Sequence, residues 1–210
     1  MNAEQTLKQR LDECPLVAII RGVTPADAEA IGAAIVDAGI RIVEVPLNSP
    51  EPLESIRILA QSLGNRATVG AGTVLDPQQV EQVRQAGGQV IVSPNTYAPV
   101  IEAAVAAGMI SLPGYFTPSE AFDALRAGAT GLKLFPAEGA SPAVVKGQRA
   151  VLPKDVPLLV VGGVKPDTMQ PWLDAGADGF GLGGGLYVPG QSAEETAAKA
   201  RAYVQGVRGR

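Results

Sequence analysis

The sequence predicts an α/β fold, a (β/α)8 barrel of the TIM type with an extra N-terminal helix. Short apolar runs alternate with longer stretches rich in Ala, Glu, Gln and Leu, and this alternation continues to the C-terminus. Runs of this kind are typical of parallel strands that are buried on both faces. The eight expected strands are Leu16–Ile20, Ile42–Pro46, Ala67–Val69, Gln89–Val92, Met109–Leu112, Gly131–Phe135, Leu158–Val161 and Gly179–Leu182.

The stretches between the runs carry the start and stop signals of helices. Several begin with an N-cap residue or an early proline and end in Ala-Gly. This repeat of roughly 20–30 residues matches the βα units of a barrel, and a first helix at about Ala3–Asp12 would cap its bottom. The starts are Thr24-Pro25, Ser49-Pro50, Asp76-Pro77, Thr117-Pro118 and Ser141-Pro142, and the ends are Ala38-Gly39, Ala86-Gly87, Ala107-Gly108, Ala127-Gly128 and Ala175-Gly176.

A doubly wound open sheet is the competing architecture. It is disfavoured because no Gly-x-Gly-x-x-Gly follows the first strand and because the repeat runs to the C-terminus. The chain shows no linker, low-complexity segment or second hydrophobic pattern. Residues 1–210 are therefore expected to form a single barrel domain.

Composition limits the classes of partner. Of the 210 residues, 46% are hydrophobic and 18% charged, which predicts a sizeable core. The net charge of −4 comes without a basic stripe and argues against a nucleic-acid or anionic-membrane partner. The start lacks the features of a secretory signal, no apolar stretch approaches a membrane span, and the only cysteine is Cys14. These features predict a cytoplasmic location.

The absence of histidine narrows the chemistry. Histidine is the usual acid–base group near neutral pH and the commonest metal ligand. With one cysteine and no acidic cluster, neither a metal site nor a metal cofactor is expected. Any general base must be a carboxylate, a lysine, a tyrosine or the thiol.

Lys133 is the most informative residue, because it stands in the middle of the apolar run Gly131–Phe135. On a strand it shares a face with Gly131 and Phe135, whereas Leu132 and Leu134 point the other way. If the leucines face the helices, Lys133 points into the barrel. Burial lowers the pKa of an amine, and a neutral amine attacks ketones. The alternative is a structural lysine that is paired with a carboxylate or reaches solvent from an edge strand.

Glu44 occupies a similar place in the run Ile42–Pro46. A buried carboxylate opposite a buried amine suits imine chemistry with a proton relay. A structural salt bridge, even to Lys133 itself, is the alternative interpretation.

Two further residues end strands, where barrel enzymes place their functional groups. Arg21 follows the first strand, and its planar guanidinium suits a carboxylate or a phosphate, although a surface arginine is equally consistent with this position. Thr73 ends the glycine-rich sequence Val69–Thr73 and offers a hydroxyl group, a weak signal by itself.

Glycine loops follow the last two expected strands. Val161 precedes Gly162 and Gly163, and Gly183 and Gly184 come after the final strand. Barrel enzymes often bind phosphate between these two loops through backbone N–H groups, which needs no positive side chain. The loops therefore predict a phosphate site, with simple turn formation as the alternative.

Taken together, the motifs resemble the KDPG/KHG aldolase family. They lie in the order and at the spacing of that family, and they cover nearly the whole chain. The matching segments are Glu-Val-Pro-Leu-Asn-Ser-Pro (44–50), Val-Gly-Ala-Gly-Thr-Val-Leu (69–75), Ser-Pro-Asn (93–95), Leu-Pro-Gly (112–114), Leu-Lys-Leu-Phe-Pro-Ala (132–137) and Val-Val-Gly-Gly-Val (160–164).

The resemblance implies a metal-free class I aldolase, usually a homotrimer, on a (β/α)8 barrel. Such a lyase would split a phosphorylated keto-deoxy sugar acid into pyruvate and glyceraldehyde 3-phosphate. Lys133 would form the Schiff base, Glu44 would be the general acid and base, and Thr73 would contact the pyruvate carboxylate. The phosphate cradle would consist of Gly162, Gly163, Gly183 and Gly184.

Within the family, the chain is most similar to the galactonate branch, which uses the arginine that matches Arg21 to bind substrate. The gluconate branch usually has Leu-Arg-Thr where this chain has Leu47-Asn48-Ser49, and threonine where Val161 stands. Asn48 and Val161 are therefore expected to bind the substrate and to help select its C4 epimer. This resemblance implies a role in carbohydrate metabolism, in the degradation of galactonate. Gly184 departs from both branches and removes one hydroxyl contact to phosphate.

Other functions remain open at this stage. A gluconate-specific or dual-specificity aldolase would differ in its turnover of the two C4 epimers. A phosphosugar isomerase or epimerase on the same fold would need no imine, and a non-catalytic sugar-phosphate binding barrel would need no Lys133.

Overall fold

The computed structural model describes residues 1–208. Its strands are β1 (Leu16–Ile19), β2 (Ile42–Pro46), β3 (Thr68–Gly72), β4 (Val90–Val92), β5 (Ile110–Leu112), β6 (Gly114–Tyr115), β7 (Leu132–Leu134), β8 (Leu158–Val161) and β9 (Gly179–Leu182). Its α-helices are α1 (Ala3–Glu13), α2 (Pro25–Asp37), α3 (Pro52–Leu63), α4 (Pro77–Gln85), α5 (Ala98–Ala106), α6 (Pro118–Arg126), α7 (Pro142–Arg149), α8 (Gln170–Asp174) and α9 (Ala193–Arg208). Short 3-10 turns are η1 (Gly64–Arg66), η2 (Ala137–Gly139) and η3 (Pro166–Thr168).

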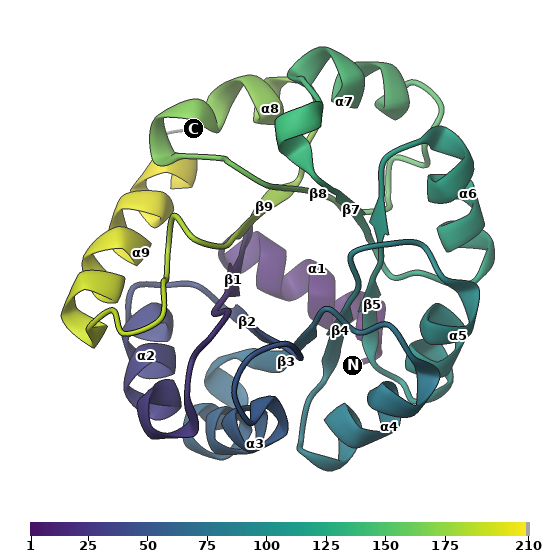
Figure 1. The fold of residues 1–210 in the computed structure, drawn as a ribbon. Helices are drawn as coiled ribbons and strands as arrows, with labels where there is room; N and C mark the ends of the chain where they lie inside the picture. Colours follow the sequence, from purple (N-terminus) through teal and green to yellow (C-terminus); the bar gives the residue numbers. More distant parts are fainter. Residues whose placement is uncertain (209–210) are drawn as a thin grey trace.

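The strands form a parallel barrel surrounded by helices (Figure 1). Their order is β5-β4-β3-β2-β1-β9-β8-β7-β6, and β5 and β6 lie on either side of Pro113. Proline has no N–H to donate to the hydrogen-bond ladder of a sheet. The Pro113 carbonyl nevertheless accepts a hydrogen bond from the Lys133 backbone N–H at 3.0 Å, and the Gly114 N–H donates to the Ser93 carbonyl at 3.0 Å. The expected fifth strand is thus one interrupted strand that closes the ring, and the predicted barrel is confirmed.

Most of the expected helix boundaries are confirmed, with one exception. Helix α1 covers the predicted N-terminal helix, and all five Ala-Gly pairs follow helix ends. The start at Ser49-Pro50 is wrong, because α3 begins at Pro52 after Glu51. The Ser49 hydroxyl instead accepts a hydrogen bond from the Gly22 N–H at 2.9 Å, which ties two loops at the top of the barrel together.

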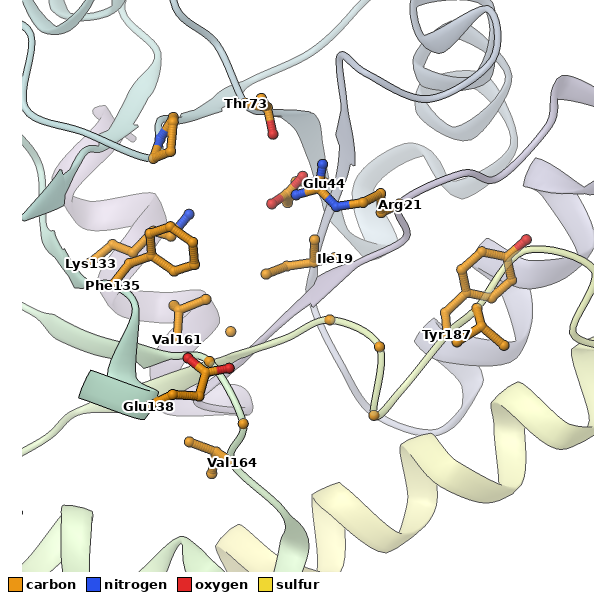
Figure 2. A pocket seen from close by; sticks show the side chains of 18 of the residues that line it. Ile19, Arg21, Glu44, Thr73, Lys133, Phe135, Glu138, Val161, Val164 and Tyr187 are labelled. Carbon is orange, nitrogen blue, oxygen red and sulfur yellow. The ribbon is translucent and has the colours of Figure 1, made fainter. Parts of the chain in front are cut away.

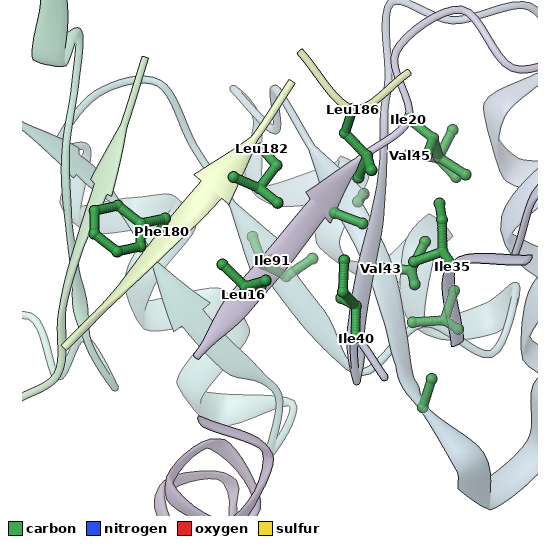
Figure 3. Packing of buried hydrophobic residues seen from close by; sticks show 14 of the residues in the cluster. Leu16, Ile20, Ile35, Ile40, Val43, Val45, Ile91, Phe180, Leu182 and Leu186 are labelled. Carbon is green, nitrogen blue, oxygen red and sulfur yellow. The ribbon is translucent and has the colours of Figure 1, made fainter. Parts of the chain in front are cut away.

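Two apolar layers hold the barrel. The larger layer fills the space between strands and helices, and Figure 3 shows it around Leu16, Val43, Ile35 and Phe180. Strand residues alternate between this layer and the barrel interior, as the period of two requires.

The smaller layer fills the bottom of the barrel. Val17, Ile42 and Leu159 meet Leu7 and Leu11 of α1 there. Figure 1 shows α1 lying across the centre of the ring of strands. Complete burial of one leucine contributes about 1.5–3 kcal/mol. This apolar plug leaves the C-terminal ends of the strands as the place for polar side chains. Within residues 1–208, no helix has the length and apolarity needed to cross a membrane.

Candidate active site

A cavity of about 570 Å³ lies at the C-terminal ends of the strands, between β1, β2, β7 and β8 and the loops that follow β3, β4 and β9. Active sites of barrel enzymes lie at this end. Figure 2 shows charged side chains entering it from different strands. Nine of the residues predicted from the sequence line it: Arg21, Glu44, Thr73, Lys133, Val161, Gly162, Gly163, Gly183 and Gly184.

The position of Lys133 follows from the pleat of β7. Leu132 and Leu134 are fully buried in the layer beneath the helices, so Lys133 between them points into the barrel. Its side chain is 7% exposed, and its Nζ lies 4.7 Å from the centre of the Phe135 ring. Among residues 1–208 it makes no ion pair and no side-chain hydrogen bond, so the expected alternative of a structural ion pair is not formed.

The surroundings of Lys133 favour the neutral amine. Burial lowers the pKa of Lys133 below its ordinary value. The negative charge of Glu44 opposes this shift, and the positive charge of Arg21 adds to it. The amine is therefore able to act as a nucleophile at a lower pH than a surface lysine.

Glu44 faces Lys133 from β2 across the cavity (Figure 2). It is 2% exposed, and its Oε2 has no hydrogen-bond partner among the described residues. Burial raises the pKa of Glu44 to about 7, against the opposing charges of Lys133 and Arg21. A carboxylate with this pKa accepts and returns protons near neutral pH.

Gly72, at the end of β3, makes room for Glu44. A methyl group placed on Gly72 would lie 2.0 Å from Glu44 Oε2 and 2.4 Å from Oε1. The backbone at Gly72 has no positive φ, so alanine fits the chain conformation there. The missing side chain is therefore needed for the position of the carboxylate and not for the fold.

We expect Gly72→Ala to displace the Glu44 carboxylate and to lower kcat by about 10²-fold, as misplacement of a reacting group by about 1 Å does. The melting temperature should change little. Steady-state kinetics and thermal denaturation measure the two effects. A similar Gly70→Ala change tests a different outcome, because its methyl group would lie 1.9 Å from the Val90 carbonyl oxygen and should destabilise the fold. Full activity in Gly72→Ala would contradict the assigned role of this glycine.

Arg21 connects the cavity to Asn48. The Arg21 Nη1 group donates a hydrogen bond to the side-chain oxygen of Asn48. Asn48 itself is exposed and does not line the cavity. Asn48, which was expected to help select the C4 epimer, therefore lies behind Arg21, and of the two only Arg21 lines the cavity.

Thr73 lies on the rim of the cavity in a strained conformation. Its φ is 57°, a left-handed value that a β-branched residue rarely adopts. A residue held in this backbone conformation destabilises the fold by about 1–3 kcal/mol, and such residues cluster at functional sites. Figure 2 shows its hydroxyl turned into the cavity.

The glycine loops line the opposite side of the cavity. Gly162 and Gly163 have φ values of 126° and 64°, which only glycine adopts without strain. Gly183 and Gly184 face open space, and a side chain added to either would meet no atom within 4 Å. The backbone of both loops is therefore accessible to a ligand from the cavity.

Twelve residues that line the cavity were not predicted from the sequence to form the site, and five of them have an evident signal in the sequence. They share a position shortly after the C-terminal end of a strand, or beside a residue that was predicted, and this position was the signal available. They are Pro94, Phe135, Glu138, Lys165 and Tyr187. In residues 1–208, no group of three or more acidic or cysteine side chains is arranged to hold a metal ion.

Comparison with known proteins agrees with this geometry. The family model for KDPG and KHG aldolase matches residues 7–200. The chain belongs to this family. It is 48% identical to the 2-dehydro-3-deoxy-6-phosphogalactonate aldolase of Escherichia coli strain K12, over 92% of this chain and 95% of the relative.

Other members of the aldolase family are also similar. The KHG/KDPG aldolase of the same organism is 33% identical, over 86% of this chain and 84% of the relative. A solved structure described as native KDPGal superimposes with a TM-score of 0.92 at 47% identity, covering 93% of this chain and 95% of that chain. The barrel and its enzyme class are thereby established.

Proposed function

We propose that this enzyme is a class I aldolase that cleaves 2-dehydro-3-deoxy-6-phospho-D-galactonate to pyruvate and D-glyceraldehyde 3-phosphate. The observation that carries the proposal is the buried, unpaired amine of Lys133, which faces the Glu44 carboxylate inside the cavity. The 48% identity to a galactonate-type aldolase, against 33% to a KHG/KDPG aldolase, supports the choice of substrate.

The first steps join the substrate to the enzyme. The neutral Lys133 amine attacks the C2 ketone and forms a carbinolamine. Glu44, protonated in part at neutral pH because its pKa is about 7, delivers a proton to the departing C2 oxygen, which leaves as water. The product is an iminium ion that withdraws electrons from the C3–C4 bond.

The next steps break the carbon–carbon bond. The Glu44 carboxylate accepts the C4 hydroxyl proton, either directly or through a water molecule. The C3–C4 bonding electrons move to the iminium, so the aldehyde leaves and an enamine remains. Protonation of the enamine at C3 and hydrolysis of the imine then release pyruvate and restore Lys133. Side chains alone perform these steps, so the mechanism requires no metal or cofactor.

The remaining site residues bind the two ends of the substrate. Arg21 and the Thr73 hydroxyl lie near Glu44 and suit the carboxylate end. The backbone of Gly162, Gly163, Gly183 and Gly184 suits the phosphate end. Val161 presents no hydrogen-bonding group to the cavity, and Asn48 acts through Arg21, so both would influence the choice of C4 epimer.

The decisive experiment compares kcat/KM for the two C4 epimers of the 6-phosphorylated keto-deoxy acid. We expect the galactonate epimer to be preferred. Equal values would indicate a dual-specificity aldolase, and a preference for the other epimer would indicate the gluconate-specific enzyme. Isomerisation or epimerisation without cleavage, or binding without turnover, would overturn the aldolase proposal.

The enzyme is further proposed to act as a cytoplasmic homotrimer. Three large apolar side chains on the loops after β3, β4 and β6 are exposed, namely Leu75 (52%), Tyr97 (45%) and Phe116 (38%). Exposed apolar groups at one rim support contact with further copies of the chain. Sedimentation equilibrium measures the mass of the assembly, and a monomer at micromolar concentration would contradict the proposal.

A further inference from the structure

Glu138 lies at the glycine loop that we propose to hold the substrate phosphate. It belongs to η2, which follows β7, and it lines the same cavity as Lys133. A methyl group placed on Gly162 would lie 2.1 Å from Glu138 Oε2, and one placed on Gly163 would lie 3.0 Å from its Cγ. Figure 2 shows the carboxylate beside Val161, on the side of the cavity opposite Arg21.

No cation neutralises this carboxylate. Within residues 1–208, Glu138 makes neither a hydrogen bond nor an ion pair. The cavity contains the guanidinium of Arg21 and the amines of Lys133 and Lys165, and none of them is paired with Glu138. The proposed phosphate cradle therefore already contains one uncompensated negative charge.

A second anion at this place is repelled by the first. The interaction is weak in water and is screened by salt, because both groups lie at the open mouth of the cavity. Backbone N–H groups have no formal charge with which to offset it. A carboxylate is therefore the wrong residue for the tightest binding of phosphate.

We propose that Glu138 weakens the binding of phosphate in the cavity and so promotes release of the phosphorylated aldehyde. This inference rests on the proposed function, since it assigns a role to one residue of the same site. Product release limits the turnover of many enzymes, so a phosphate held too tightly would slow the cycle. The alternative role, support of the Gly162–Gly163 turn by packing, predicts the opposite effect of substitution.

The test uses inorganic phosphate as the probe and compares four proteins. Glu138→Gln removes the charge and keeps the shape, Glu138→Asp keeps the charge, and Glu102→Gln removes an exposed charge on α5 outside the cavity. Competitive inhibition of cleavage and calorimetric titration both yield the phosphate dissociation constant. At low ionic strength we expect Glu138→Gln to bind phosphate about three- to ten-fold more tightly than wild type, with Glu138→Asp and Glu102→Gln close to wild type.

The salt dependence provides a second measurement. The ratio of phosphate affinity between Glu138→Gln and wild type should fall toward one at about 1 M NaCl, where charges more than about 3 Å apart are screened. Weaker phosphate binding in Glu138→Gln would show that the residue supports the turn, and this result would overturn the proposal. An unchanged phosphate dissociation constant in Glu138→Gln, or a gain in phosphate affinity that salt does not reduce, would also overturn the proposal.

Failure of the proposed function has a different signature. Calorimetry measures phosphate binding without turnover, so the role of Glu138 is tested even in a protein that cleaves nothing. A wild-type enzyme that cleaves the substrate while phosphate binds equally well in all four proteins would overturn the inference alone. Absence of both cleavage and a trapped imine would overturn the proposed function and leave the phosphate measurement valid.

Discussion

Lys133→Met is expected to abolish cleavage, with kcat/KM reduced by about 10⁴-fold or more, the scale seen when a catalytic nucleophile is removed. Without the amine no imine forms, and without the imine the C3–C4 electrons have no acceptor. Methionine has a similar length and no charge to desolvate at a site that is 7% exposed. The variant should therefore fold with stability equal to or above that of wild type.

The matched measurement is trapping with pyruvate and borohydride, followed by peptide mass analysis. Wild type should carry a reduced adduct on the peptide that contains Lys133, and Lys133→Met should carry none. Lys165 also lines the cavity, but it is exposed. Lys165→Met should therefore still form the adduct at Lys133. An adduct on Lys165 would assign the imine to that residue in place of Lys133, and activity retained in Lys133→Arg would contradict the imine mechanism and favour an isomerase or epimerase.

The strands and the residues on them could be predicted from the sequence, because strand periodicity decides which side chains point inward. A charged residue between two leucines, as at Lys133, has one interpretation once the leucines face the helices. The same reasoning placed Glu44 on the inner face of β2. Glycines after the last two strands were informative for a similar reason, since a barrel brings the ends of its strands together.

The loops could not be predicted in this way. Their paths depend on contacts between residues far apart in sequence. One example is the hydrogen bond between Gly22 and Ser49, which uses the Ser49 hydroxyl outside the helix, so that α3 begins at Pro52. The role of Gly72 in making room for Glu44 depends on the register of β2 and β3. Glu138 follows Phe135-Pro136 in a short turn, and nothing in its local sequence indicates that it reaches Gly162.

Glu44→Gln is expected to lower kcat by about 10²- to 10⁴-fold, the usual contribution of a general acid and base. The pH profile is the more specific readout. In the proposed mechanism Glu44 first delivers a proton and only then accepts one, so the free enzyme must hold this carboxyl group in its protonated form. Because the pKa of Glu44 is about 7, wild-type kcat/KM should fall as the pH rises through about 7. Glutamine cannot ionise, so this fall should be absent in the residual activity of the variant. An unchanged profile would assign the fall to another group and would remove Glu44 from the proton relay.

The same substitution should stabilise the fold at alkaline pH. The folded-state pKa of Glu44 is about 7, above the ordinary value of 4.5, so the folded protein holds this proton more tightly than the unfolded chain does. The associated stability is complete below 4.5 and is lost as the pH rises through 7. Glutamine mimics the protonated acid at every pH and avoids this loss.

Urea denaturation of both proteins at about pH 4 and about pH 8.5 measures the difference. We expect similar free energies of unfolding in acid and an advantage for Glu44→Gln on the order of 3 kcal/mol in base. The sign of this difference in the free energy of unfolding distinguishes a catalytic Glu44 from a structural one. If Glu44 were a structural partner of Lys133, its removal would destabilise the fold most at neutral pH, where both groups would be charged. A gain in stability accompanied by a loss of turnover would show that the carboxylate is retained for catalysis at a cost to the fold.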